Sequence, residues 1–226
     1  MRFWNDTIFS PVPSDAELAD LSKRLGVSLP GNYARLLQEY NGAKPLDTAF
    51  DVTIGGKKHT FCIDRFLGIL GGDVSAPLNA FNMETVLSLF QQQVPLENAM
   101  HSKCDLLPIM VLFDGDLVCL DYRQGEMPSV CIWFHEESQA NRQTYPVADS
   151  FEGLIEKCYE EHAPSVDSDV TLCNTLNEKM GTQETPYGYI WHFTEKPGQA
   201  QLVPLAIHLA FSHTGGRAPG MWGSYR

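Results

Sequence analysis

The spacing of apolar residues changes along the chain, and this change limits the fold more than any other feature. Residues 15–40 carry apolar side chains at helical intervals, whereas residues 50–135 form apolar stretches separated by glycine-containing turns, as strands do. The helical interval returns at residues 151–161, after a capping box at residues 149–152. Helices on both sides of a run of antiparallel strands predict an α+β domain.

The two N-terminal helices have well-marked ends. Ser14 and Glu17 fit a capping box, and Gly26 is suited to a left-handed stop, so the first helix is expected between them. Pro30 is typical of a first helical turn, and the Asn-Gly pair at residues 41–42 ends the second helix. These signals predict a helical hairpin.

Six segments are expected to form strands, with one helix between them. A double glycine at residues 55–56 is expected to join the first two strands in a hairpin, because glycine adopts positive φ without strain. The expected strands are 50–54, 57–63, 66–70, 107–113, 117–122 and 130–135, and the helix is expected at 83–92.

Residues 163–169 have the composition of a linker, since they are small and polar and include a proline. They divide the chain into a first module, residues 1–162, and a tail, residues 170–226. A tail of about 60 residues is too short to bury a large core by itself. Either a metal ion holds the tail together or the tail packs on the first module.

Charge is unequal between the two parts. The whole chain has a formal charge of -12, and residues 163–226 contain five acidic and four basic side chains, which leaves -11 to residues 1–162. A field of this sign repels phosphate backbones and attracts basic surfaces. Nucleic-acid binding by the first module is therefore not expected, and its acidic surface either solubilises the protein or docks a basic partner.

Membrane and secretory features are missing from the sequence. The longest apolar stretch, residues 106–113, contains a proline and is far below the roughly 20 residues that a membrane helix needs. Residues 1–6 lack the apolar run of a secretory signal, so a cytoplasmic location is expected. The six cysteines contain no CxxC pair, which favours buried reduced thiols over disulfides or a zinc site.

Four motifs of the first module follow the order of a known family. They are Leu29-Pro30-Gly31-Asn32-Tyr33 with Glu39-Tyr40-Asn41-Gly42, then Leu107-Pro108-Ile109, then Asp114-Gly115-Asp116 with Val118-Cys119-Leu120-Asp121, and Val147-Ala148-Asp149-Ser150-Phe151. Residues 10–162 thereby resemble the SMI1/KNR4 superfamily, also called SUKH. The resemblance implies no catalysis; bacterial members are immunity proteins that bind and block a cognate toxin domain, often a nuclease. The docking residues are expected among exposed acids, with Asp114, Asp116 and Asp121 as candidates.

The tail contains a second set of motifs, and three of the seven histidines of the chain fall within 22 residues there. The motifs are Tyr187-Gly188-Tyr189-Ile190-Trp191-His192-Phe193, Gln201-Leu202-Val203-Pro204, His208 and His213-Thr214-Gly215-Gly216. Residues 171–216 resemble the WHH branch of the HNH/endonuclease VII nucleases, which are toxin domains of the ββα-metal fold. The resemblance implies a small ββα-metal-like module in which His192, His208 and His213 hold a divalent ion such as Zn²⁺, Mg²⁺ or Mn²⁺.

One position departs from the nuclease pattern. Phe193 stands where the family has the histidine that activates water, and a phenyl ring cannot accept a proton. General-base catalysis contributes about 10²–10⁴-fold, so the tail is expected to be catalytically impaired. Glu195 is the candidate replacement base, because residues 193 and 195 share a face where the chain is extended. His208 and His213 differ by about 140° on an ideal helix, so a helix has to end between them.

These features favour a bacterial immunity-type protein whose acidic first module blocks a basic nuclease toxin and whose tail is an impaired nuclease remnant. Two alternatives stay open. In the first, the chain is an active metal-dependent endonuclease on DNA or RNA, with the first module as its regulator. In the second, both parts belong to a non-catalytic interaction scaffold. Nucleic acid is an expected partner only in the first alternative, and a membrane is a partner in none.

Overall fold

The structure is a computed structural model, and it describes residues 1–3, 9–70, 79–93, 104–136, 144–160, 169–211, 215–216 and 221. The predicted linker, residues 163–169, lies almost entirely outside this set, as does His213.

The N-terminal hairpin forms as predicted. Helix α1 (Asp15–Leu25) begins with both hydrogen bonds of the Ser14–Glu17 capping box and ends at Gly26, whose φ is 66°. Helix α2 (Gly31–Tyr40) starts one residue later than predicted, because Pro30 occupies the capping position rather than the first turn. Both ends of α1 are set by local hydrogen bonds, which explains why the sequence predicts them.

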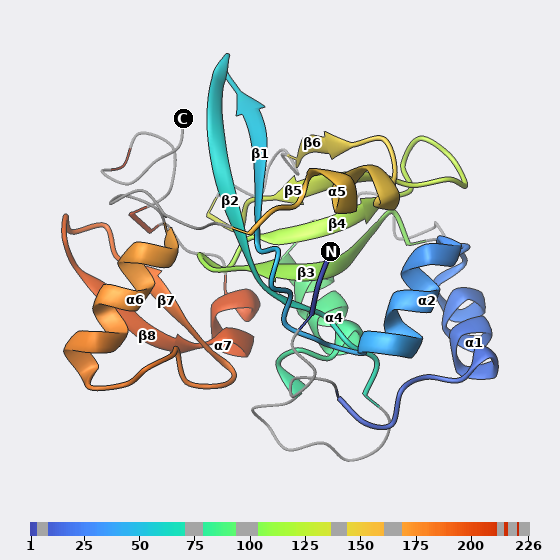
Figure 1. The fold of residues 1–226 in the computed structure, drawn as a ribbon, viewed down its shortest axis with the longest axis horizontal. Coiled ribbons are helices and arrows are strands. Elements are labelled where there is room, and N and C mark those ends of the chain that lie inside the picture. The colour runs from blue at the N-terminus through green and yellow to red at the C-terminus, as the bar shows by residue number, and fades with distance from the viewer. Residues whose placement is uncertain are drawn as a thin grey trace.

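A six-stranded antiparallel sheet forms the centre of the first module (Figure 1). Its order is β1-β2-β3-β4-β5-β6, so each strand pairs with its neighbour in the sequence. The strands are β1 (Ala49–Ile54), β2 (Lys57–Phe66), β3 (Leu106–Leu112), β4 (Leu117–Asp121), β5 (Ser129–Trp133) and β6 (Thr144–Ala148). With α4 (Met83–Gln93) and α5 (Phe151–Lys157) packed against the sheet, the module is the α+β domain that the sequence predicts.

The core of the first module runs along its central strands. Every residue of β3 and of β4 is buried, so both faces of these strands are covered. The five cysteines of this module are reduced, and four of them are buried in it. Burial raises the pKa of Cys104 and of Cys131 to about 12, which keeps both thiols protonated at neutral pH.

Elements after the N-terminal hairpin also differ from the prediction. Residues 66–70 do not form a strand of their own, because β2 continues to Phe66 and Gly68 makes only a single bridge, to Asn82. Helix α5 ends at Lys157, since Tyr159 leaves the helix and exchanges two backbone hydrogen bonds with Ala49. The edge strand β6 was not predicted; it contains a proline, which weakens the strand signal of the sequence.

Residues 2 and 160 meet on the surface of the first module. The Arg2 guanidinium donates to Asp47 Oδ1 at 2.8 Å and to Glu160 Oε2 at 2.5 Å. Phe3 also bridges Pro45 through the backbone. The beginning and the end of this module are therefore held at the same corner.

The tail forms a helix followed by a hairpin and a short second helix. Its elements are α6 (Asp169–Met180), β7 (Tyr189–Phe193), β8 (Ala200–Pro204) and α7 (Leu205–Ala210). Figure 1 shows the tail at one end of the sheet, with α7 beside α4, and these two helices are in contact. Ile190, Leu205 and Leu209 belong to the same buried cluster as the core of the first module. Of the two alternatives for the tail, packing on the first module is thus observed.

No helix among the described residues is long and apolar enough to cross a membrane.

Candidate functional site

The two faces of strand β7 have different surroundings. Its side chains alternate, so Trp191 and Phe193 point to one face and pack with Cys173 of α6. Trp191 also donates its indole N–H to Asn177 Oδ1 at 2.9 Å. Ile190 joins the core of the first module on the other face, and His192 shares that face.

His192 and His208 meet at the junction of the tail with the first module. The centroids of their rings are 5.4 Å apart, with an angle of 58° between the planes. His208 is only 4% exposed, although it lies on a helix of six residues. The resemblance to nucleases thus names two histidines that the fold does bring together, and we call them the histidine pair.

Helix α7 ends where the spacing of the histidines requires. Its last residue is Ala210, and Phe211 has extended backbone angles. The prediction that the helix ends between residues 208 and 213 is confirmed. The third expected ligand, His213, lies outside the described residues.

Neither predicted base position lies beside the histidine pair. Phe193 is 4% exposed, and its ring is part of the cluster on the α6 face of β7. Glu195 is an exposed residue in the bend after β7, which ends at Phe193. The extended segment that would place residues 193 and 195 on one face is absent here, because the chain turns at residues 195–198 to enter β8.

The first module supplies a second set of titratable groups to this junction. His135 and Glu136 lie one residue beyond the end of β5, and both are buried. The ring of His135 lies 4.2 Å from that of His208, measured between centroids. Glu136 Oε1 lies 3.6 Å from His135 Nε2 and 3.9 Å from His192 Nδ1. One carboxylate therefore stands between a histidine of each part.

Asp116 fixes the position of His135. Its Oδ1 accepts hydrogen bonds from the backbone N–H of His135 at 2.9 Å and from His135 Nδ1 at 2.7 Å. Burial lowers the pKa of His135, but the carboxylates of Asp116 and Glu136 outweigh that effect and raise the pKa to about 10. The two carboxylates therefore favour the protonated form of the His135 ring.

The turn between β3 and β4 lies against the other member of the histidine pair. Gly115 in this turn has a φ of 91°. A Cβ placed on Gly115 would stand 2.6 Å from His208 Nε2 and 3.2 Å from Ile190 Cδ1. Only glycine fits here, both for its backbone conformation and for this close approach.

The three acids expected on an exposed docking face are buried. Asp114 is 4% exposed, Asp116 is 3% exposed and Asp121 is 8% exposed. Asp114 Oδ1 accepts from the backbone of Asp116 in the turn, and Asp121 accepts from Arg123 Nε at 2.9 Å. Their expected exposure is wrong: Asp114 accepts a backbone hydrogen bond within the β3–β4 turn, Asp116 accepts from His135, and Asp121 accepts from Arg123 after β4.

The described residues contain two of the three expected metal ligands, His192 and His208. Among them, no group of three or more His, Cys, Asp or Glu side chains has the arrangement to hold an ion. The Gly115 turn lies against His208 Nε2, and the Glu136 carboxylate lies on the Nδ1 side of His192. The Gly115 backbone and the Glu136 side chain, both from the first module, thus lie next to the histidine pair.

His135 and Glu136 are site residues that the sequence does not predict, because the apolar pattern places residue 135 at the end of a strand. The available signal is a titratable pair that closely follows the buried strand β5. These two residues come close to residues 192 and 208 only through tertiary packing, which no spacing in the sequence predicts.

Two sequence families match separate parts of the chain. The SMI1 / KNR4 family (SUKH-1) matches residues 13–157. A family described as a nuclease of the HNH/ENDO VII superfamily with conserved WHH matches residues 181–223. No curated protein and no solved structure matches the chain significantly.

Proposed function

The chain belongs to the SMI1/KNR4 family (SUKH-1), and from this premise we propose that it is an immunity-type protein that binds a nuclease toxin and blocks it. The first module would dock a basic surface of the toxin and keep nucleic acid away from it. The mechanism is stoichiometric, with one toxin held by each first module.

A groove between α2 and α5 is the observation that carries this proposal. It encloses about 370 Å³, and its floor is apolar. The floor residues are Phe3, Leu36, Tyr40, Phe151 and Ile155, and the polar residues at its rim are Asn32, Arg35, Glu39, Glu152 and Glu156. The rim has three acidic side chains and one basic side chain around an apolar floor. Such a groove suits a partner segment that is both basic and apolar.

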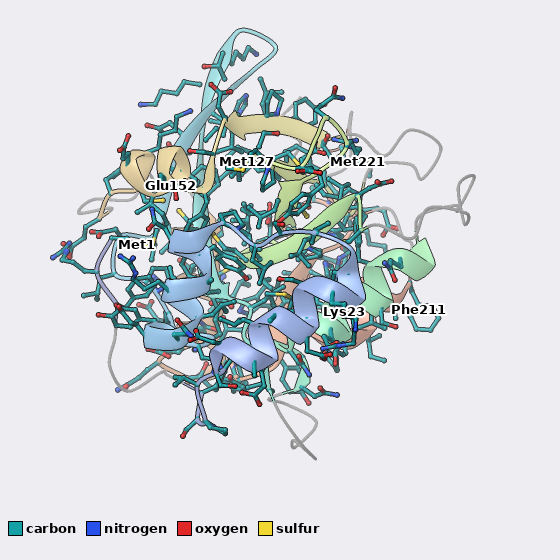
Figure 2. The ribbon with its side chains drawn as sticks, turned by 90° about the vertical axis from the view of Figure 1, so that its right-hand side faces the viewer. Met1, Lys23, Met127, Glu152, Phe211 and Met221 are labelled. Atoms are coloured by element: carbon teal, nitrogen blue, oxygen red, sulfur yellow. The ribbon has the colours of Figure 1, made fainter. Side chains whose placement is uncertain are left out.

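The groove lies away from the tail. Figure 1 shows α2 and the tail at opposite ends of the molecule, and in Figure 2 Met1 and Glu152, which both line the groove, lie close together on the left of the view. A partner in the groove therefore does not compete with the tail for space. The charge of -11 on residues 1–162 adds long-range attraction for a basic toxin, which speeds encounter.

Charge reversal in the groove tests the proposal. The probe is a nuclease toxin taken from a gene neighbouring that of this chain, and its binding is measured by calorimetry at two salt concentrations. We expect Glu39→Lys combined with Glu156→Lys to weaken binding by about tenfold or more and to reduce protection of cells that co-express the toxin. Glu126→Lys, an exposed reversal outside the groove, is the matched control. Equal affinities for the two variants would overturn the proposal.

A metal-dependent endonuclease is the second candidate function, and the approach of His192 to His208 favours it. In this case the purified protein nicks plasmid DNA with Mg²⁺, Mn²⁺ or Zn²⁺, and His208→Ala abolishes the nicking. Protein that leaves the plasmid intact with all three ions removes this candidate.

A further inference from the structure

The histidine pair is enclosed by residues of the first module, and this enclosure is separate from the α2–α5 groove. We infer that the β3–β4 turn and the end of β5 form a binding surface for the histidine pair of a WHH-type nuclease segment, and that the tail of this chain is its occupant. We call this surface the cover and define it as residues 114–116, His135 and Glu136. The inference uses none of the groove residues and so stands apart from the toxin-binding proposal.

The first part of the cover closes over His192. Glu136 is 8% exposed, and its Oε1 lies 3.9 Å from His192 Nδ1. Gly215 approaches from the tail, where a Cβ would collide with the Glu136 carboxylate and would stand 2.7 Å from His192 Cε1. The next residue, Gly216, donates its N–H to Phe193 O at 2.6 Å. Two separate segments of the tail, at His192 and at Gly215, thus approach the Glu136 carboxylate.

The second part of the cover closes over His208. The Gly115 backbone approaches His208 Nε2 so closely that no side chain fits between them. The ring of His135 lies against the ring of His208 from the direction of β5. His208 is consequently enclosed by two different segments of the first module.

The cover is ordered by its own hydrogen bonds. Asp116 accepts two hydrogen bonds from His135, while Asp114 accepts from the backbone of Asp116. A buried charged group needs such partners, because an unpaired carboxylate in this place would be strongly unfavourable. The acids of this turn therefore shape a rigid surface that fits imidazole rings.

The apolar surroundings hold the tail in place against the cover. Ile190 precedes His192 by two residues, and Leu205 and Leu209 flank His208 on α7. All three are buried in the core of the first module. The histidine pair is consequently brought to the cover by burial of its neighbours, so this contact is part of the fold.

Chemical modification of histidines tests the inference on the full chain. Diethyl pyrocarbonate is applied under native conditions, and the rates at His192 and His208 are read by mass spectrometry against free N-acetylhistidine. We expect both rates in the wild-type protein to be at least about tenfold below the free rate, because modification needs local opening. Wild-type rates close to that of N-acetylhistidine would overturn the inference.

Two variants open the cover in different ways. Gly215→Ala introduces the clash with Glu136 and His192, and Glu136→Gln keeps the shape of the side chain but removes its charge. We expect each variant to raise the modification rates of the histidine pair several-fold. Gly31→Ala is the matched control, because no atom lies within 4 Å of the added Cβ. Rates that stay at the wild-type level in both variants would contradict the inference.

Hydrogen exchange and toxin binding separate the two proposals. If Gly215→Ala folds poorly, exchange of β3 and β4 will report it, and Glu136→Gln then provides the test. Toxin binding by the groove is measured on the same proteins. If a cover variant loses protection of the histidine pair but still binds the toxin, the result supports the cover and leaves the groove proposal unaffected. If the wild-type protein protects the histidine pair but does not bind the toxin, only the toxin-binding proposal is overturned.

Discussion

The first module and the tail bury their apolar residues in different ways. The first module has two central strands, β3 and β4, that are buried on both faces by residues of the same module and of the tail. The tail has only a small cluster of its own around Trp191, and it places Ile190, Leu205 and Leu209 in the core of its neighbour. A nuclease-like segment of this size thus acquires much of its stability, and the surroundings of its histidines, from another part of the chain.

This difference matters for any function assigned from motifs. The WHH-type pattern of the tail correctly indicates that His192 and His208 meet. The pattern says nothing of the carboxylate beside them, which comes from Glu136 in the first module. A motif analysed alone names candidate residues, whereas the packing decides which other groups surround them.

The largest expected effect comes from matched Leu→Ala substitutions in the two regions. Leu120 in β4 and Leu205 in α7 are both fully buried. Each substitution is expected to cost about 2–5 kcal/mol through lost contacts and a cavity. Hydrogen exchange should show that Leu120→Ala weakens protection in the whole chain, while Leu205→Ala weakens it in β7, β8 and α7 only. Equal loss of protection everywhere would mean that the two regions form one cooperative unit.

The Phe193→His variant tests whether residue 193 faces the histidine pair, as a catalytic base would, or belongs to the apolar core of the tail. Because the side chain points to Trp191 and Cys173, the introduced imidazole would be buried in an apolar cluster. We expect the variant to lose about 2 kcal/mol of stability in denaturant unfolding and to gain no plasmid nicking with Mg²⁺, Mn²⁺ or Zn²⁺. Phe193→Leu is the apolar control and should lose less. Nicking by the histidine variant would show that the strand presents residue 193 to the site.

Thiol labelling compares opening of the two regions without any mutation. Burial raises the pKa of Cys131 to about 12 and likewise raises the pKa of Cys173 in the tail, so neither native thiol reacts rapidly at pH 8. Because the tail has the smaller core of its own, Cys173 should label at least about tenfold faster than Cys131 under native conditions. The rates are measured with iodoacetamide and mass spectrometry. Labelling of both thiols at one rate would contradict separate opening.

The smallest effect is expected from the cap of α1. Ser14→Ala removes the hydroxyl that accepts from the Glu17 N–H, which costs about 1 kcal/mol. The loss should appear in exchange of α1 and leave β7 and α7 unchanged. A change at β7 would show that the N-terminal helices communicate with the tail.

The extent to which the sequence predicts this molecule follows from the range of the interactions involved. Both ends of α1 are predicted because Ser14, Glu17 and Gly26 act within a few residues of the helix. The strand pattern also predicts that His192 and Phe193 point to opposite faces, because successive side chains of a strand alternate. The nuclease motif, in contrast, places both positions in one site.

The contacts across the two parts have no comparable signal. Glu136 and His192 are far apart in sequence, and only the docking of the tail brings them to 3.9 Å. The burial of Asp114, Asp116 and Asp121 was missed for a related reason, because composition does not tell a solvated acid from one that accepts backbone hydrogen bonds. Charge near a turn was therefore a poor guide to the docking surface.

The ion pairs of Arg2 with Asp47 and Glu160 place the two ends of the first module side by side, which matters for gene fusion and protein engineering. A module whose entry and exit are neighbours can be spliced between two foreign sequences as a cassette, with little strain on its own sheet. Any sequence that replaces the residues after 160 would also have to cover the part of the module's core that Ile190, Leu205 and Leu209 close. Two fluorophores attached near residues 2 and 160 would be close together in the folded module. Unfolding of the module would increase the distance between them.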